Sequence, residues 1–187
     1  IENGIILEEY IKPGIQLKYE RSLKNRMHIS TSLFKGLHIE PKNLDIYPTY
    51  MQWVDRITEY MSKQQDKREF YSYMKKAKDI CTEITSLYPQ KFLLHGDFHY
   101  DNILLGENGE YKIIDPKGVI GPLVFDLPRY LLNEFGDDEK SSSEERYHII
   151  NKIIDHFEIK LQIPANVIKQ SFFVEMAMGT CWDIEDG

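Results

Sequence analysis

Apolar residues recur three or four positions apart in five stretches of this 187-residue chain. This spacing is typical of helices that pack one face against a core. Ser143 is the expected cap of the fourth helix, Pro89 ends the third, and Pro164 opens the last. The pattern therefore predicts helices over residues 17–37, 50–61, 70–87, 143–157 and 164–182.

A short β-hairpin interrupts the helical pattern. The apolar runs 103–105 and 111–114 are separated by Gly106-Glu107-Asn108-Gly109, which is typical of a tight turn. Another β-rich run, residues 4–11, ends at Lys12-Pro13-Gly14 and is expected to form an edge strand. Together these elements predict an α+β fold, in which a mostly helical lobe carries a small hairpin at its active face.

Three oxygen-bearing side chains should meet at the open end of this hairpin. Asn102 precedes the first strand and Asp115 follows the second, so the returning chain makes them neighbours. Asp97 stands shortly before them, on a loop that Gly96 allows to turn sharply. An amide beside a carboxylate suits Mg²⁺, and a second carboxylate off the metal can orient a hydroxyl and take its proton. Each residue alone is typical of a turn or a cap, but their combined spacing favours a functional site.

The segment 95–102, which reads H-G-D-F-H-Y-D-N, also fits the phosphoryl-transfer loop H-x-D-x-x-x-x-N of kinase-like enzymes. With Asp115-Pro116-Lys117-Gly118 downstream, the chain resembles the aminoglycoside phosphotransferase family, most closely its streptomycin 6-kinase/hydroxyurea phosphotransferase branch. The resemblance implies the C-terminal lobe of a protein-kinase-like fold. It also implies that Asp97 is the catalytic base and that Asn102 and Asp115 bind Mg²⁺. ATP would then give its γ-phosphate to a hydroxyl of a small molecule, such as a streptomycin-like aminoglycoside.

Three further residues are expected to support this loop, and a fourth, Lys117, is a candidate for contact with phosphate. His95 and His99 are interpreted as loop-organising residues that bond backbone groups, rather than as proton-transfer groups or metal ligands. Asp126 is a helix cap or, by the resemblance, a carboxylate that accepts N–H groups of the catalytic loop. Lys117 is either a contact to the transferring phosphate or a surface lysine.

The start of the chain carries a separate expectation from the resemblance. Residues 1–14 would form the hinge strand and turn, and residues 15–187 the catalytic and substrate lobe. Backbone groups of Glu9, Tyr10 and Ile11 would then contact the adenine of ATP. The glycines before the loop, at positions 4, 14 and 36, make no G-x-G-x-x-G, and no strand of the Val-Ala-Ile-Lys type is present. We therefore expect the N-terminal nucleotide lobe to be absent from this chain, and the chain alone to be inactive.

Composition narrows the class of partner. The formal net charge of −7 argues against nucleic-acid binding and is compatible with a cationic small substrate. Cys81 and Cys181 form neither metal-ligand spacing nor a disulfide framework, so a reducing cytoplasm is expected. No apolar run approaches the roughly 18 residues of a membrane span, so no membrane partner is expected.

The acceptor is the least determined part of the prediction. Acidic residues after the hairpin and near the C-terminal end are candidates for binding a protonated aminoglycoside, namely Asp138, Glu139, Glu175, Asp183 and Glu185. Charge runs of this kind are usually only solvated, which leaves that assignment open. Two alternatives remain: a kinase for another metabolite such as choline or homoserine, and a pseudokinase-like lobe that binds without transfer. The intact set of Asp97, Asn102 and Asp115 favours an enzyme.

Overall fold

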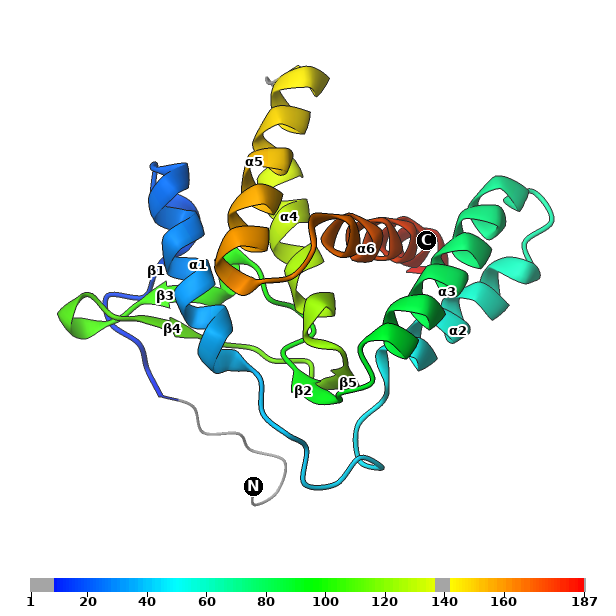
Figure 1. Ribbon diagram of the computed structural model, residues 1–187, viewed down its shortest axis with the longest axis horizontal. Helices are drawn as coiled ribbons and strands as arrows, with labels where there is room; N and C mark the ends of the chain where they lie inside the picture. Colours follow the sequence, from blue (N-terminus) through cyan, green and yellow to red (C-terminus); the bar gives the residue numbers. More distant parts are fainter. Residues whose placement is uncertain (1–8, 137–141, 187) are drawn as a thin grey trace.

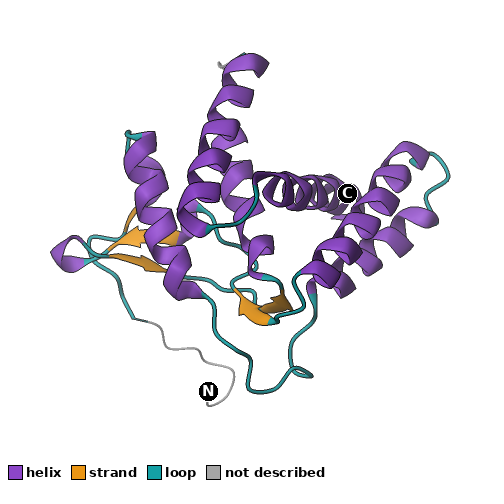
Figure 2. Ribbon diagram, in the orientation of Figure 1, coloured by secondary structure: helices purple, strands orange, loops and turns teal. Residues whose placement is uncertain are grey.

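The chain is mostly helical, as its apolar spacing predicts (Figure 2). The structure is a computed structural model that describes residues 9–136 and 142–186. Among the helices of these ranges, none combines the length and the apolar character that crossing a bilayer requires. The helices are α1 (Leu23–Leu37), α2 (Tyr50–Ser62), α3 (Arg68–Leu87), α4 (Leu127–Gly136), α5 (Ser143–Leu161) and α6 (Ala165–Asp186).

Two small antiparallel sheets connect the helices. The predicted hairpin is confirmed: β3 (Ile103–Leu105) pairs with β4 (Tyr111–Ile113). A second sheet joins β2 (Phe92–Leu94) to β5 (Val119–Gly121), and the segment between β2 and β3 carries the predicted catalytic loop. After β4 the chain continues to β5, which pairs with β2. The segment before β3 and the segment after β4 therefore both lie at the open end of the hairpin. The prediction of a mostly helical α+β lobe with a small hairpin is therefore confirmed.

The expected edge strand over residues 4–11 lies only partly within the described residues. Residues 4–8 lie outside the described part of the chain, and residues 9–11 form no strand. A strand does form just after the predicted turn: β1 (Ile15–Gln16) pairs with β3 on the side opposite to β4. Pairing starts here because Gly14 N donates to Leu105 O at 3.0 Å, which brings the chain onto the edge of β3.

Two helix starts differ from the prediction because of their caps. The segment predicted as one helix over 17–37 begins with a 3₁₀ turn, η1 (Leu17–Tyr19), and α1 starts only after Ser22, whose Oγ accepts from Asn25 N. Helix α5 is capped by Ser142 rather than Ser143, because Glu145 bonds back to the Ser142 N–H and completes a capping box.

Helix α6 lies between the α2–α3 pair and the α4–α5 pair and packs against all four helices (Figure 1). The predicted apolar face of α2 is confirmed, since its four residues are all buried: Tyr50, Val54, Ile57 and Met61. The predicted face of α3 is confirmed only in part: Ala77 and Ile84 are fully buried, but Tyr73 and Leu87 are 43% and 63% exposed. Met74 and Cys81, on the neighbouring stripe, are fully buried in addition. Two neighbouring stripes of this helix are apolar, and contacts with α2 and α6 decide which of their residues are buried.

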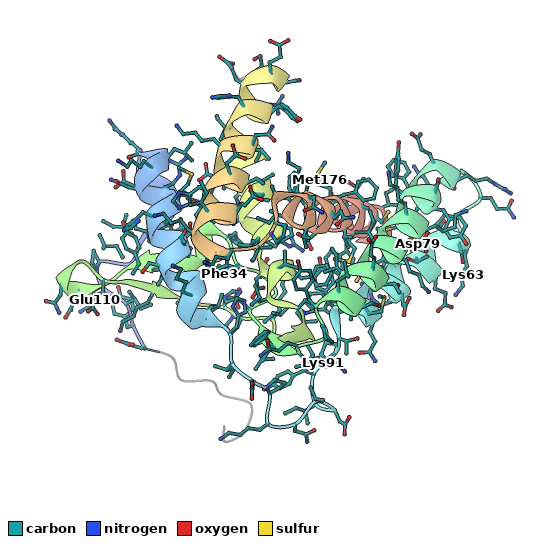
Figure 3. The ribbon with its side chains drawn as sticks, viewed as in Figure 1. Phe34, Lys63, Asp79, Lys91, Glu110 and Met176 are labelled. Carbon is teal, nitrogen blue, oxygen red and sulfur yellow. The ribbon has the colours of Figure 1, made fainter. Side chains whose placement is uncertain are left out.

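The predicted catalytic loop is packed against aromatic side chains of the helices. Phe98, in the middle of the loop, is fully buried. Its ring lies 6.0 Å from that of Phe34 on α1 and 6.2 Å from that of Tyr130 on α4. Figure 3 places Phe34 between Glu110, at the tip of the hairpin, and Lys63, just after α2. The loop is therefore fixed to the helical body rather than carried by the hairpin alone.

Candidate active site

The loop turns sharply at Gly96, as its sequence predicts. The φ angle of Gly96 is +75°, a region that side chains disfavour. Space is also restricted, because a Cβ at this position would lie 3.1 Å from Trp53 Cη2 and 3.1 Å from Val119 Cγ1. Glycine therefore allows the chain to turn directly after β2, with its backbone at residue 96 close to the Trp53 indole.

Asp126 ties the loop to the helical body. Its Oδ1 accepts from Gly96 N at 2.7 Å and its Oδ2 from His95 N at 2.9 Å. His38 Nε2 lies 3.0 Å from the same Oδ2. Asp126 is buried at the end of η4 (Leu123–Asp126), directly before α4. This is the geometry of the loop tie that the family resemblance implied.

His95 joins the loop to the segment that follows β4. Its Nε2 lies 2.9 Å from Ile114 O, and its Nδ1 accepts from Asp97 N at 3.2 Å. These two partners require the proton on Nε2. The His95 carbonyl also accepts from Lys117 N at 2.8 Å and Gly118 N at 3.2 Å. The contacts agree with the predicted loop-organising role of His95.

Asn102 and Asp115 lie at the open end of the hairpin, as predicted. Ile114 N donates to Asn102 O at 3.0 Å, so Asp115 follows the residue that pairs with Asn102. The Asn102 amide nitrogen donates to Asp97 O and to His99 Nε2, each at 3.1 Å, which leaves Oδ1 as the acceptor of this side chain. Asp115 is exposed, and its φ of 60° turns the chain sharply away from β4.

These two oxygens fit a magnesium–nucleotide site. Within residues 9–136 and 142–186, no group of three or more His, Cys, Asp or Glu side chains could hold a metal by itself. Mg²⁺ bound with a nucleotide does not need such a group, because phosphate oxygens and water fill most of its coordination sphere. One amide oxygen and one exposed carboxylate are a suitable protein contribution.

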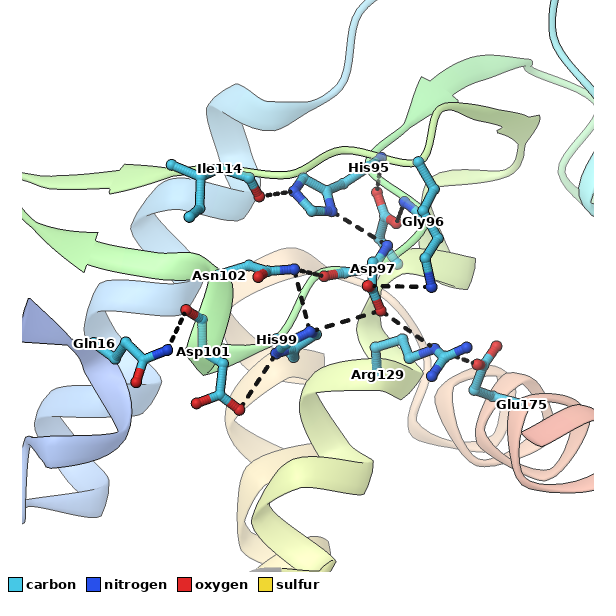
Figure 4. Close-up of polar contacts among 12 residues, drawn as sticks. Gln16, His95, Gly96, Asp97, His99, Asp101, Asn102, Ile114, Arg129 and Glu175 are labelled. Atoms are coloured by element: carbon cyan, nitrogen blue, oxygen red, sulfur yellow. Dashed lines mark hydrogen bonds and ion pairs between the residues drawn. The ribbon is translucent and has the colours of Figure 1, made fainter. Parts of the chain in front are cut away.

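The Asp97 carboxylate faces three nitrogen-bearing side chains (Figure 4). Lys117 Nζ lies 3.2 Å from Oδ2, while His99 Nε2 and Arg129 Nε each lie 3.7 Å from Oδ1, too far for a hydrogen bond. Burial raises the pKa of Asp97, but His99, Lys117 and Arg129 outweigh it and lower the pKa to about 2. Asp97 is therefore ionised at neutral pH and can accept a hydrogen bond from a hydroxyl.

Comparison with known proteins shows the origin of this geometry. Residues 2–187 match the family model described as aminoglycoside/hydroxyurea antibiotic resistance kinase. The chain belongs to this family. It is also 27% identical over 99 residues to the streptomycin 6-kinase of Streptomyces griseus, an alignment that covers 53% of this chain and 32% of that protein.

Solved structures show that this family member has a kinase-like fold. Choline kinase LicA from Streptococcus pneumoniae superposes with a TM-score of 0.65 at 15% identity, over 94% of this chain and 60% of that one. A choline kinase from Cryptosporidium parvum gives 0.59 at 17% identity, over 94% and 63%. LicA has also been solved in complex with AMP, with a TM-score of 0.64. The chain thus spans about a third of its curated relative and about 60% of these kinases.

Two residues that the sequence pattern did not assign to the site, Arg129 and Tyr50, meet there with Glu175 in this resistance-kinase family member. Arg129 on α4 pairs through Nε with Glu175 Oε1 on α6 at 2.6 Å. Tyr50 on α2 donates its hydroxyl to Glu175 Oε2 at 2.5 Å. Glu175 interrupts an apolar stretch of α6, and a charge in such a stretch requires a partner, which is the signal that could have found this cluster.

The prediction that Glu175 contacts the substrate is wrong. The residue is 2% exposed, and its two oxygens face Arg129 and Tyr50 rather than the surface. Burial raises the pKa of Glu175, and the charge of Asp97 adds to this effect, although Arg129 and Tyr50 oppose it.

The structure does not gather the other candidate acids around Asp97. Glu185 pairs with Arg56 Nη1 at 2.7 Å, and Asp183 is exposed on α6. Asp138 and Glu139 lie outside the described residues. The candidate acids that the structure describes, Glu175, Asp183 and Glu185, are therefore not gathered into one acceptor site beside Asp97.

The predicted hinge residues lie beside the hairpin. Glu9 Oε1 accepts from Lys112 Nζ on β4 at 2.5 Å, and Tyr10 is 82% exposed. Ile11 is half-buried, and its side chain faces Gly106 at the hairpin turn. Their contact with adenine stays a prediction.

Proposed function

We propose that the protein is an ATP- and Mg²⁺-dependent phosphotransferase that moves the γ-phosphoryl group of ATP to a hydroxyl of a small molecule. One observation carries this proposal: the ionised Asp97 carboxylate is fixed beside the hairpin end that bears Asn102 and Asp115. Membership of the resistance-kinase family and the kinase-like fold support it.

Asp97 would act on the acceptor hydroxyl. The hydroxyl donates a hydrogen bond to Asp97 and its oxygen attacks the γ-phosphorus. The bond from the γ-phosphorus to the bridging oxygen breaks, ADP leaves, and the hydroxyl proton passes to Asp97. A carboxylate with a pKa of about 2 is a weak base, so Asp97 mainly orients the hydroxyl and takes its proton late. Late proton transfer agrees with the loose transition state of phosphoryl transfer.

Asn102 Oδ1 and the Asp115 carboxylate would hold the metal. When bound, Mg²⁺ offsets the negative charge of the nucleotide phosphates. The protein's own part is to orient these ligands. Asp97 O and His99 fix the Asn102 amide, while His95 fixes the backbone on either side of Asp115.

Lys117 and the hinge segment would complete the nucleotide contacts. The Lys117 backbone is tied to His95, but its side chain is 47% exposed and can exchange Asp97 for a phosphate oxygen. That exchange would release Asp97 Oδ2 when the nucleotide binds. Backbone groups of residues 9–11 are our proposed contact to the adenine.

For the acceptor we propose an aminoglycoside-type antibiotic such as streptomycin. The support is the family and the streptomycin 6-kinase relative, not an acidic pocket. Lys117 and Arg129 next to Asp97 disfavour an acceptor whose own cation lies close to the reacting hydroxyl. Choline carries its ammonium only two carbon atoms from its hydroxyl, whereas a larger aminoglycoside can keep its cations further away. A choline- or homoserine-like acceptor is therefore our second candidate.

The test uses the protein expressed from its complete coding sequence. Asp97→Asn should lower kcat ~10²- to 10⁴-fold, as removal of a general base typically does. Nucleotide affinity should change little, because Asp97 is not a proposed metal ligand. Asp79→Asn, the same change on exposed α3, is the matched control (Figure 3). A turnover of Asp97→Asn similar to that of the control would remove Asp97 from the mechanism.

A second variant tests the metal site, and a panel of acceptors tests the substrate. Asp115→Ala should weaken both Mg²⁺–nucleotide binding and rate, measured with a fluorescent nucleotide analogue titrated with magnesium. ADP release is then followed with streptomycin, other aminoglycosides, hydroxyurea, choline and neutral sugars. Faster turnover of choline than of any aminoglycoside would favour the second candidate. Nucleotide binding without turnover of any acceptor would favour a pseudokinase-like role.

A further inference from the structure

Arg129 lies between two carboxylates and is not shared equally by them. Its Nε lies 2.6 Å from Glu175 Oε1 but 3.7 Å from Asp97 Oδ1 (Figure 4). The first distance is a contact ion pair, and the second is longer than a hydrogen bond. The arginine therefore places its charge near Asp97 without occupying the Asp97 oxygen.

The Glu175 side of this arrangement is firmly held. Tyr50, itself buried, donates its hydroxyl to Glu175 Oε2 and stacks on Phe125 with ring centroids 4.1 Å apart. The Arg129 guanidinium also lies over the Trp182 ring, 5.5 Å from its centroid. Residues of α2, α4 and α6 thus fix where Arg129 can reach.

We propose that Glu175 is a positioning residue that retains Arg129 at a distance from Asp97, so that Asp97 Oδ1 stays free to accept the hydroxyl of the acceptor. The proposal rests on the phosphotransferase function proposed above and adds a residue to it. Glu175 itself touches neither acceptor nor nucleotide in this account.

The charges around Asp97 indicate that Glu175 keeps Arg129 from forming a hydrogen bond with Asp97. Asp97 and Glu175 face Lys117 and Arg129, so two negative groups balance two positive ones. If residue 175 were neutral, Asp97 would be the carboxylate left to Arg129. A shift of about 1 Å would close the 3.7 Å gap to hydrogen-bond distance. Arg129 and Lys117 would then occupy both oxygens of Asp97, and an acceptor hydroxyl would have to displace one of them.

Kinetics on the protein from the complete coding sequence test this account. Glu175→Gln should lower kcat roughly 10- to 100-fold and leave the nucleotide Kd unchanged, because misplacing one group by about 1 Å has effects of this size. The double variant Glu175→Gln/Arg129→Gln should regain at least about threefold in kcat, because the arginine that blocks Asp97 is gone. A merely structural role predicts the opposite, with the double variant no faster than the single one, and that result would overturn the proposal.

Glu134→Gln is the matched control. Glu134 on α4 also pairs with an arginine, Arg26, and accepts a hydrogen bond from the Tyr130 hydroxyl. This cluster connects α1 to α4 and includes no contact with Asp97. Its kcat should equal that of the wild type. An equal loss in Glu134→Gln and Glu175→Gln would show that loss of a buried carboxylate, not release of Arg129, slows the reaction.

A measurement without turnover separates this inference from the proposed function. The Nε–H signal of Arg129, assigned by its loss in Arg129→Gln, is recorded by NMR in each background. Asp97→Asn should leave this signal nearly unchanged when Glu175 is present and should shift it in Glu175→Gln. If Asp97→Asn leaves the Arg129 signal unchanged both in wild type and in Glu175→Gln, the inference is overturned even if Asp97 is catalytic. The expected shift supports the inference even if no acceptor is turned over.

Discussion

Two clusters in this chain use the same three residue types in different ways. In the first, which we call the anchor cluster, Arg26 binds both oxygens of Glu134 at 2.7 and 2.6 Å and also donates to Glu20 O at 2.7 Å. Tyr130 completes it, 3.2 Å from Glu134 Oε1. In the second, which we call the site cluster, Arg129, Glu175 and Tyr50 meet beside Asp97.

The difference lies in how the arginine is used. The Arg26 guanidinium is engaged through all three nitrogens, and such a fork is a rigid connection between two helices. Arg129 pairs with Glu175 through Nε and turns towards the Trp182 ring and the Asp97 carboxylate. The comparison teaches that the residue types of a buried ion pair do not reveal its role. What the arginine faces beyond its glutamate does.

Removal of the arginine should give the largest effects and break the two clusters apart. Arg26→Met and Arg129→Met each leave a buried carboxylate without its cation, which should lower the unfolding free energy by roughly 3–5 kcal/mol. Urea denaturation measures this loss. Only Arg129→Met should also reduce turnover per folded molecule, because Glu175 then lies near Asp97 without its cation, a condition that the double variant Glu175→Gln/Arg129→Gln avoids. If Arg129→Met kept full turnover, the site cluster would be an anchor like the other one.

Removal of the tyrosine hydroxyls should also affect the two clusters differently, with smaller losses of unfolding free energy. Tyr50 OH lies 2.5 Å from its glutamate and Tyr130 OH lies 3.2 Å from its own. A short hydrogen bond to a carboxylate contributes about 1.5–3 kcal/mol, and a long one less. Tyr50→Phe should therefore destabilise the protein more than Tyr130→Phe in the same urea series. Equal losses would mean that the Tyr50 hydroxyl is not the tighter anchor.

A pH series should detect the burial of Glu175. Its pKa is raised above the usual 4.5, because burial makes the charged form less favourable than it is in the unfolded chain. The associated stability is present below pH 4.5 and is lost as the pH rises towards the folded pKa. Wild type should therefore lose stability relative to Glu175→Gln as the pH rises above about 4.5, measured by urea denaturation up to pH 8. The same series with Glu134→Gln shows whether this pH dependence is specific to the site cluster. If wild type instead gained stability relative to Glu175→Gln as the pH rises, the expected direction would be wrong.

The smallest effect is expected for an exposed pair on the same helix as Glu175. Glu185→Gln removes the contact with Arg56, whose side chain is 53% exposed. Exposed pairs of this kind contribute about 0.2–1 kcal/mol and weaken with salt. Turnover should not change. A loss as large as that of Arg26→Met would show that exposure does not rank these pairs.

The hairpin of β3 and β4 was predictable because its information is local. The turn at Gly106-Glu107-Asn108-Gly109 and the flanking apolar runs determine which residues share the open end of the hairpin, so Asn102 and Asp115 could be paired from spacing alone. Asp97 follows from Gly96, whose positive φ sets the turn. The apolar face of α2 also followed from its spacing, since a single stripe of this helix is strongly apolar.

The site cluster could not be predicted in this way, because it depends on contacts far apart in the chain. Tyr50 and Glu175 are 125 positions apart, and no local pattern links α2 to α6. The same limit explains why the buried face of α3 differs in part from the predicted face. The helix has two neighbouring apolar stripes, and its contacts with α2 and α6 determine which of their residues are buried. By itself the sequence determined the hairpin, the convergence of Asp97, Asn102 and Asp115 at its open end, and the helical character of the chain. Tertiary structure alone decided which charges surround Asp97, because only the packing of α2, α4 and α6 brings Tyr50, Arg129 and Glu175 to one place.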